Sequence, residues 1–424
     1  MQAQTLAQKL IAKACNQPSV AVNEIVTCRV DLAMFHDSSG PRRLKPMLEK
    51  LGARIWDKSK VVLVMDHYVP EEDDDSRRIL KIARDWAAEQ QLPNVYDSIG
   101  ICHVVLPQKG HVKPGMLCVG GDSHSPTGGA FGAYMFGVGS TEMLGVVVTG
   151  QIWVKVPKTI MMQWSGRLQA GVTAKDMMLH MIGLYGTNGA DYNAVEFTGA
   201  AVSALSMQER MTLSNMSAEL GAQAGLIAPD QTTVDFLRVA GVAEEIDLAH
   251  WKTDAHADVE IHRFDASVLA PMVAAPHSPG NSHAVDQFDK VPVQIAYIGA
   301  CTGAKLDDLR AAARVLGNRK IDPAVRLLVA PASQLDQQAA QKEGIMDTLI
   351  DAGAEIFATS CGACSGYGNA LAGAGNVISS TARNFKGRMG SVETNVYLAS
   401  PYTVAASALT GHITDPRTIL AEAR

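Results

Sequence analysis

Apolar strands that end abruptly in short loops of polar or small residues are the feature that most restricts how this chain can fold. Val61–Met65 runs directly into Asp66 and His67, and residues 116–121 run into Asp122, Ser123 and His124. In open α/β sheets, chemical groups are placed beyond the carboxyl ends of buried strands. The repetition of this pattern predicts an α/β protein whose site lies where several strands end.

Three cysteines follow the same pattern farther along the chain. Residues 295–298 lead through two small residues to Cys301, and residues 354–357 lead to Cys361 and Cys364, which have C-x-x-C spacing. The small residues around them let the backbone wrap closely around whatever the sulfurs hold. The other four cysteines lie in apolar helical or strand-like surroundings and are expected to be buried thiols: Cys15, Cys28, Cys102 and Cys118.

Three clustered cysteines admit two kinds of metal site. On a four-iron cluster they would leave one iron without a protein ligand, free to bind a substrate hydroxyl and carboxylate as a Lewis acid. The alternative is a zinc site completed by a histidine, because C-x-x-C is a common zinc half-site. A cluster that only carries electrons normally has four protein ligands, which argues against electron transfer. The cysteine spacing alone leaves cluster and zinc open.

The length of the chain, 424 residues, predicts about three domains. A boundary is expected near Pro157, where a new strand begins, and a second within the irregular Pro-, His- and Ser-rich stretch 255–289. We therefore predict domains at residues 1–157, 158–287 and 288–424. The last alternates strands with helices, which predicts a mostly parallel sheet with Cys301, Cys361, Cys364 and residues 381–388 all at one edge.

Composition excludes several function classes. The net charge is −6 and no basic run is present, so nucleic-acid binding has no electrostatic support. The amino terminus lacks the pattern of a signal peptide, and no apolar run is long enough to span a bilayer. Seven cysteines, an odd number without a regular framework, argue against a secreted disulfide-linked protein. We expect a cytoplasmic protein.

Several other polar residues have both a functional and a plain structural interpretation. His36 and Asp37 follow an apolar run and could form a site edge or a solvated loop. His103 stands among apolar residues, as many core histidines do. Residues 211–225 are predicted as one helix, which would place Asn215 and Glu219 on a common face, in contact with solvent or with a site.

Taken together, the motifs resemble the aconitase superfamily, and more closely the separate large subunit of isopropylmalate isomerase (3-isopropylmalate dehydratase) or homoaconitase type. The resemblance covers nearly the whole chain, and implies an aconitase-like three-domain α/β/α architecture around a central [4Fe–4S] cluster. The motifs that carry it are Asp66-His67, residues 121–124, residues 215–221, residues 276–279, residues 299–302, residues 361–366 and residues 383–388.

The resemblance also implies a role for each candidate residue. Cys301, Cys361 and Cys364 would hold the cluster, with Asn215 beside it. Asp66 would orient His67, the general acid that protonates the leaving hydroxyl. Carboxylate–imidazole pairing favours the protonated ring and fixes its tautomer. By the same match, Asp122 pairs with His103 and Glu219 with His124 as further catalytic residues, and the substrate contacts are His36, Asp37, Ser123, Arg383 and Arg388.

Three residues depart from the family pattern. Gly303 and Ala382 stand where the family usually has Asn, and Ala363 stands where a Pro is common between the paired cysteines. Two amide side chains near the cluster are therefore lost. Because hydrogen bonds to sulfurs and substrate tune such sites, we hypothesise a non-standard substrate or a retuned site.

One role is unfilled, because the family's proton-abstracting serine and a neighbouring substrate-binding arginine lie on a fourth domain that this chain is not expected to contain. We therefore expect a separate small subunit as partner. The expected function is a hydro-lyase large subunit that dehydrates and rehydrates a 2-hydroxy di- or tricarboxylate such as 3-isopropylmalate. Alternatives are homoaconitase, hydration of a maleate-, citraconate- or dimethylmaleate-type acid, and, in a different class, an RNA-binding regulator, which the acidic balance disfavours.

Overall fold

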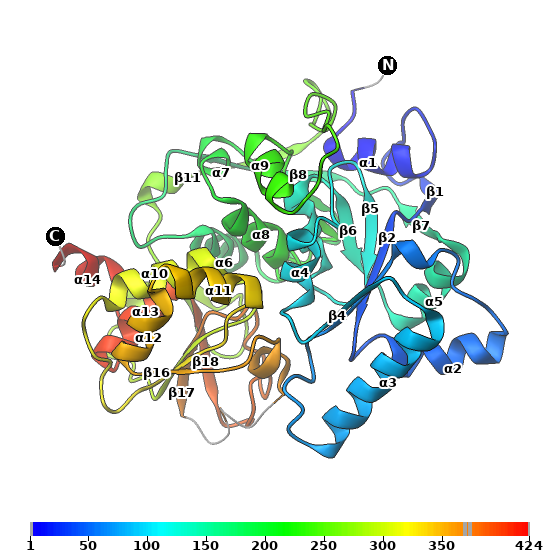
Figure 1. The fold of residues 1–424 in the computed structure, drawn as a ribbon. Helices are drawn as coiled ribbons and strands as arrows, with labels where there is room; N and C mark the ends of the chain where they lie inside the picture. Colours follow the sequence, from blue (N-terminus) through cyan, green and yellow to red (C-terminus); the bar gives the residue numbers. More distant parts are fainter. Residues whose placement is uncertain (1–2, 368–370, 372–374, 423–424) are drawn as a thin grey trace.

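The computed structural model describes residues 3–367, 371 and 375–422, and within them the chain forms three larger sheets flanked by helices (Figure 1). The amino-terminal sheet, in blue and cyan, lies on the right of the view. The green middle part lies at the top, and the yellow-to-red carboxyl-terminal part lies at the lower left. The three parts meet toward the centre of the molecule.

The first sheet has the strand order β4-β3-β2-β5-β6, and all of its neighbouring strands are parallel. Its strands are β2 (Leu32–His36), β3 (Val61–Met65), β4 (Asn94–Asp97), β5 (Leu117–Gly120) and β6 (Tyr134–Gly137). The helices in this part of the chain are α1 (Leu6–Ala14), α2 (Pro41–Leu51), α3 (Asp74–Gln90), α4 (Cys102–Gln108) and α5 (Ser140–Thr149). A separate antiparallel pair is formed by β1 (Ile25–Arg29) and β7 (Gln151–Lys155).

The second sheet, of order β10-β9-β8-β11, is also parallel throughout. Its strands are β8 (Thr159–Ser165), β9 (Ala194–Thr198), β10 (Ala224–Leu226) and β11 (Glu260–Asp265). Its helices are α6 (Ala174–Tyr185), α7 (Ala200–Ser203), α8 (Met207–Met216) and α9 (Gln231–Val239). Thr173 caps α6 by accepting a hydrogen bond from the backbone N–H of Lys175, which explains why the helix starts where it does.

The third sheet has the order β13-β12-β18-β17-β14-β15-β16 and is parallel from β18 to β16, while β12 is antiparallel to both of its neighbours. Its strands are β12 (Met272–Ala274), β13 (Ser282–Ala284), β14 (Ile295–Ile298), β15 (Arg326–Val329), β16 (Ala354–Ile356), β17 (Asn376–Ser379) and β18 (Asn395–Ala399). Its helices are α10 (Leu306–Leu316), α11 (Gln334–Lys342), α12 (Ile345–Ala352), α13 (Pro401–Thr410) and α14 (Pro416–Glu422). The mostly parallel sheet predicted for this region is confirmed.

Short 3₁₀ helices occupy several of the loops: η1 (Lys58–Lys60), η2 (Ser125–Phe131), η3 (Ala266–Val268), η4 (Val285–Phe288) and η5 (Gly362–Ser365). The largest buried apolar cluster joins the first and third sheets, since it includes Met34 and Val64 as well as Ile298 and Val329. A shared core of this kind holds the strand ends of the two sheets at fixed positions. The predicted domain boundaries themselves stay a prediction.

Two further expectations concern the burial of the other four cysteines and the length of the apolar helices. Cys28, Cys102 and Cys118 are buried, as expected, but Cys15 is only half-buried at the end of α1. Among the described helices, none combines the length and the apolar character that crossing a membrane requires.

Candidate active site

The predicted site residues lie at the points in two of the sheets where the strand order reverses. In the first sheet, β2 is flanked by β3 on one side and by β5 on the other, so a crevice opens between the ends of β2 and β5. His36 ends β2, and Asp122 follows β5 closely. In the third sheet, β14 lies between β15 and β17, and Cys301 and Arg383 follow β14 and β17. Both switch points therefore carry predicted site residues.

Asp37 is fully buried and binds backbone amides rather than facing a pocket. Its Oδ1 accepts hydrogen bonds from the backbone N–H groups of Asp66 and His67 at 3.1 and 3.0 Å, and its Oδ2 accepts one from Tyr68 at 2.7 Å. The carboxylate thus fixes the loop that follows β3. This corrects the prediction of Asp37 as a substrate contact, because a side chain without exposed surface cannot reach a ligand.

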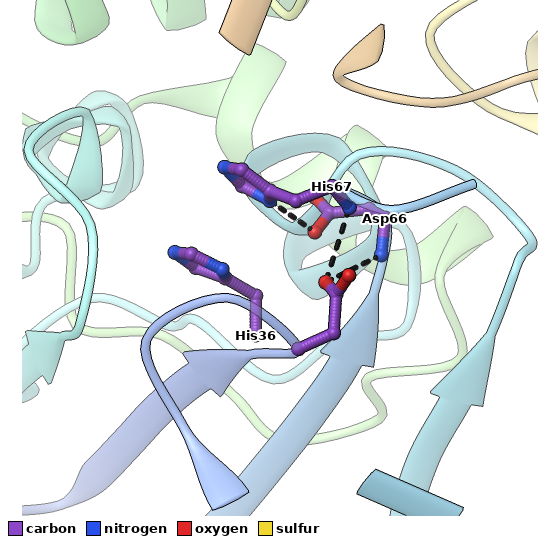
Figure 2. Close-up of side chains that lie close together, drawn as sticks. His36, Asp66 and His67 are labelled. Atoms are coloured by element: carbon purple, nitrogen blue, oxygen red, sulfur yellow. Dashed lines mark hydrogen bonds and ion pairs between the residues drawn. The ribbon is translucent and has the colours of Figure 1, made fainter. Parts of the chain in front are cut away.

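Asp66 and His67 form the pair that was predicted after β3. His67 Nδ1 lies 2.7 Å from Asp66 Oδ1, while Asp66 Oδ2 accepts a 2.7 Å hydrogen bond from the backbone N–H of Cys102. Burial lowers the pKa of His67, but the charge of Asp66 and its hydrogen bond more than offset this and raise the pKa to about 10. Figure 2 shows the His67 ring lying face to face with that of His36, at a centroid distance of 3.7 Å. His67 is therefore protonated at neutral pH.

Asp122 is the centre of a histidine network. His103 Nε2 lies 2.6 Å from its Oδ1, as predicted, and the backbone N–H of His124 donates to the same oxygen at 2.8 Å. The Nε2 atoms of His36 and His67 lie 3.6 and 3.8 Å from Oδ2. Burial alone would raise the pKa of Asp122, but His103 and the other rings hold it well below its usual range. Asp122 is therefore a carboxylate with several imidazole neighbours.

Glu219 joins the third predicted carboxylate–histidine pair to an arginine. Its Oε1 lies 2.9 Å from His124 Nε2 and accepts a 2.6 Å hydrogen bond from Arg383 Nε. Burial opposes ionisation of Glu219, but His124 and Arg383 outweigh it and lower the pKa of the carboxyl group. Arg383 also donates through Nη1 to Ser123 Oγ at 2.8 Å. Glu219 thus orients a histidine and a predicted substrate arginine at once.

The helix predicted for residues 211–225 is wrong at its carboxyl end. α8 stops at Met216, so Asn215 lies in its last turn and Glu219 lies in the turns that follow, before β10. Asn215 Nδ2 donates to Thr127 Oγ1 at 2.8 Å and to Cys301 Sγ at 3.2 Å. Both polar residues still face the site, but through different elements, and the plain solvent-exposed interpretation is excluded because both are buried.

The three predicted cysteines follow β14 and β16 into the same region. The backbone N–H of Cys361 donates to the carbonyl oxygen of Asp66 at 2.8 Å, which ties the C-x-x-C loop to the loop after β3. A hydrogen bond from Cys361 lowers the pKa of Cys364 in spite of burial, and Arg388 acts in the same direction. Burial raises the pKa of Cys301 to about 12 in the metal-free protein.

The spacing of the cysteines does not favour the zinc alternative. Zinc–sulfur bonds of about 2.3 Å would place the sulfurs of one zinc site roughly 3.8 Å apart. Among the described residues, each group of three or more histidine, cysteine or acidic ligand atoms within 4.8 Å of one another consists only of histidines and aspartates. No group of this kind among the described residues contains the three cysteines, so the structure shows no ready-made single-ion site built from them.

Buried polar atoms without partners mark where a ligand would be held. Asn215 Oδ1, Glu219 Oε2 and Arg388 Nε are buried and have no hydrogen-bond partner in the part of the chain that the structure describes. Such atoms are costly unless a bound group satisfies them. Arg388 Nε is a donor and suits an anionic ligand, whereas Asn215 Oδ1 and Glu219 Oε2 are acceptors that need a donor such as a hydroxyl group or water.

A cavity of about 390 Å³ opens over this region. Six of the predicted residues line it, whereas Asp37, Asp66, His103, His124, Asn215 and Glu219 support it from behind. Sequence reasoning missed Ser38, Tyr68 and Tyr367, which also line it, and Thr127, which holds Asn215. Only their nearness to identified motifs could have indicated them. The predicted residues in the lining are His36, His67, Asp122, Ser123, Arg383 and Arg388.

The side chain of Ser380 packs against Gly303, the position where the family usually has Asn. A Cβ atom at this position would lie 2.3 Å from the Cβ and Oγ atoms of Ser380. The Ser380 hydroxyl accepts from the backbone N–H of Gly299 at 2.9 Å and reaches the carbonyl oxygen of Gly303 at 3.2 Å. Ala382 is itself buried in an apolar cluster. An amide side chain at 303 would therefore require Ser380 to move.

Comparison with known proteins gives the family. The model of the aconitase family (aconitate hydratase) matches residues 8–292 and 286–411. The chain belongs to the aconitase family. A solved structure, aconitase X of Thermococcus kodakaraensis in its holo form, aligns to this aconitase-family chain with a TM-score of 0.51 and 12% identity, covering 87% of this chain and 88% of that one. That likeness supports the α/β fold.

Curated relatives are much more similar in sequence. The 3-isopropylmalate dehydratase large subunit of Desulfatibacillum aliphaticivorans is 40% identical, over 97% of this chain and 99% of its own length. A probable 3-isopropylmalate dehydratase large subunit of Methanothermobacter thermautotrophicus is 41% identical, over 97% and 98%. A probable methanogen homoaconitase large subunit from the same organism is 39% identical, over 97% of each chain.

Proposed function

We propose that this chain is the cluster-bearing large subunit of a hydro-lyase that removes water from, and returns it to, a 2-hydroxy di- or tricarboxylate such as 3-isopropylmalate. One observation carries the proposal: a histidine paired with a buried aspartate, a carboxylate–histidine network and two arginines surround one cavity beside three cysteines. Relatives that share about 40% of the sequence over full length are named for this activity.

Cys301, Cys361 and Cys364 would hold a [4Fe–4S] cluster with one iron open to substrate. When bound, the cluster would supply a Lewis acid that weakens the bond between carbon and the leaving hydroxyl. Asn215 would fix the Cys301 thiolate through its 3.2 Å hydrogen bond.

The leaving hydroxyl needs a proton, because hydroxide is a poor leaving group. His67 would donate it, since Asp66 holds the ring at Nδ1 and leaves Nε2 directed toward Asp122 and the cavity. Asp122 would orient the surrounding rings through its contacts with His103 and His36.

Arg383 and Arg388 would bind the substrate carboxylates, for which the guanidinium fork is suited. Arg383 is held in place by Glu219 and Ser123. Arg388 Nε has no hydrogen-bond partner among the described residues and could donate to an anionic ligand. Ser123 lies beside Arg383 at the cavity wall and would add a hydroxyl donor.

We further propose a separate small subunit that supplies the serine and arginine for abstraction of the carbon-bound proton. The support is that relatives matched over 97% or more of their own length are themselves named large subunits. Homoaconitase activity is the second candidate, favoured by one of these names. A cytoplasmic location stays part of the proposal.

The test is anaerobic co-purification with the small subunit, followed by assay against 3-isopropylmalate, homocitrate, dimethylmalate, citraconate and maleate. We expect dehydration of 3-isopropylmalate, loss of activity in His67→Gln with the cluster retained, and a cluster signal in electron paramagnetic resonance that changes on addition of substrate. Full cluster occupancy without turnover of any of these acids would refute the proposal. Turnover of homocitrate alone would select the second candidate.

A further inference from the structure

Lys175 is a buried cation that the site described above does not use. It is the second residue of α6, its side chain is 1% exposed, and it points away from solvent. Its Nζ donates to the backbone carbonyl oxygens of Ser380 and Thr381, at 2.7 and 2.6 Å. No carboxylate in the described chain lies within 4.0 Å of this ammonium group.

This placement is unfavourable for a lysine in the metal-free protein. Burying an ammonium group without a counter-ion is costly, and carbonyl dipoles only partly replace its hydration. The first turn of a helix also carries the positive end of the helix dipole, which repels a cation. Burial lowers the pKa of Lys175 to about 8, against the pull of Asp308. A residue that breaks the usual rules for buried charges and for helix termini in this way is expected at a functional site.

A second buried lysine in the same region shows the contrast. Lys305 is equally buried, but its Nζ forms a 2.7 Å ion pair with Asp308 in addition to hydrogen bonds to Thr212 and to the carbonyl oxygen of Cys301. The charge of Lys305 is therefore neutralised within the protein. The charge of Lys175 is not.

The loop that Lys175 holds connects the cluster cysteines to a substrate arginine. The carbonyl oxygen of Ser380 also accepts from Thr302 Oγ1 at 3.0 Å, next to Cys301, and the same loop continues to Arg383. Asp308 exerts the largest electrostatic attraction on Lys175, and Cys364 and Glu219 add smaller ones that also raise its pKa. Lys175 therefore lies behind the junction of the loops after β14 and β17, which carry Cys301 and Arg383.

We propose that Lys175 is a positioning residue whose ammonium charge compensates the negative charge of the thiolate-bound cluster and holds the 380–383 loop against Cys301. The inference rests on the proposed function, because it requires the three cysteines to bind a cluster. A nearby positive charge stabilises the more negative, reduced state of a cluster and so raises its midpoint potential.

Three substitutions separate the charge from the hydrogen bonds. Lys175→Met removes both, Lys175→Gln keeps a donor for the carbonyls without the charge, and Lys175→Arg keeps the charge. The measurements, made on the reconstituted complex with its small subunit, are the midpoint potential, the rate of loss of cluster absorbance in air, and KM and kcat. The melting temperature of the metal-free chain is measured alongside.

We expect a lower midpoint potential and faster cluster loss in both Lys175→Met and Lys175→Gln, with Lys175→Arg close to the unsubstituted protein. The metal-free Lys175→Met chain should melt somewhat lower than the unsubstituted chain, because the lost donor to two buried carbonyl oxygens outweighs the relief of burying a charge. If Lys175→Gln retains the unsubstituted potential and cluster lifetime, or if only the melting temperature falls, the charge-compensation role is refuted. If the unsubstituted complex binds no cluster at all, it is the proposed function that fails.

Discussion

Glu219→Gln is the substitution that most directly tests the geometry of the site. One carboxylate oxygen of Glu219 contacts both His124 Nε2, at 2.9 Å, and Arg383 Nε, at 2.6 Å. Glutamine has nearly the same shape, so the change removes the charge while it leaves the packing in place. The experiment therefore measures what the buried charge contributes.

The expected cost follows from these contacts. A hydrogen bond to a charged group contributes about 1.5–3 kcal/mol, and a neutral one about 0.5–1.5 kcal/mol, so weakening both bonds loses about 2–3 kcal/mol. The substitution also leaves Arg383 without its carboxylate in a largely buried position, and breaking a buried pair in this way costs about 3–5 kcal/mol in total. We expect the variant to lose about 3–4 kcal/mol of unfolding free energy at pH 7.

The assay is denaturant unfolding of the metal-free chain as a function of pH. Since folding lowers the pKa of Glu219, its contribution is fully present above the unfolded value of 4.5 and is lost as pH falls through the lower folded value. The gap between the two proteins should therefore close under acid conditions. In the double variant with Arg383→Gln, the second change should cost less than it does alone. A gap below about 1 kcal/mol at pH 7, or strict additivity, would refute the reasoning.

Three further predictions concern single contacts. Asp37→Asn should lower the denaturation midpoint by an equivalent of about 1–3 kcal/mol, because an amide N–H₂ cannot accept from the loop backbone; an unchanged midpoint would contradict its positioning role. Folding raises the pKa of buried Glu196 from 4.5 to about 7, so the free energy of unfolding should fall as pH rises through that range. Glu196→Gln should abolish about 3 kcal/mol of this loss, measured as the difference in unfolding free energy between pH 4 and pH 8. Gly303→Ala should destabilise the protein by about 1–3 kcal/mol, because the added Cβ atom would clash with Ser380. The control Gly280→Ala, whose added Cβ atom would have contacts of 3.4 Å or more, should leave the melting temperature unchanged. Equal effects of the two substitutions would contradict the tight packing of residue 303 against Ser380.

Much of the site could be predicted from sequence because its chemistry is local. An Asp–His dipeptide after an apolar strand, and cysteines in small-residue loops, place their groups at a sheet edge whatever the rest of the chain does. The strand-end pattern indicated Asp66 and His67, whereas the pairing of Asp122 with His103 was implied only by the family resemblance; the structure has the two pairs at 2.7 and 2.6 Å.

The tertiary structure decided what each polar group faces. Asp37 belongs to a predicted site motif, yet its oxygens are taken by backbone amides some 30 residues away in sequence, at His67 and its neighbours. The periodicity of residues 211–225 could not show that α8 ends at Met216, because a tight turn leading into a buried strand overrides helix propensity.

The tertiary structure also decided the surroundings of the buried lysines near the cysteines. Sequence spacing already offers Lys305 a carboxylate, because Asp308 stands three residues further on, but it does not show that Lys175 is buried. Only the folded chain places Lys175 against the backbone carbonyl oxygens of Ser380 and Thr381, more than 200 residues away in sequence. The sequence thus determined which reactive groups the protein carries. The packing of separate sheets determined which of their charges have no counter-charge within the protein. Coulomb interactions depend on distances between elements, and sequence spacing does not contain those distances.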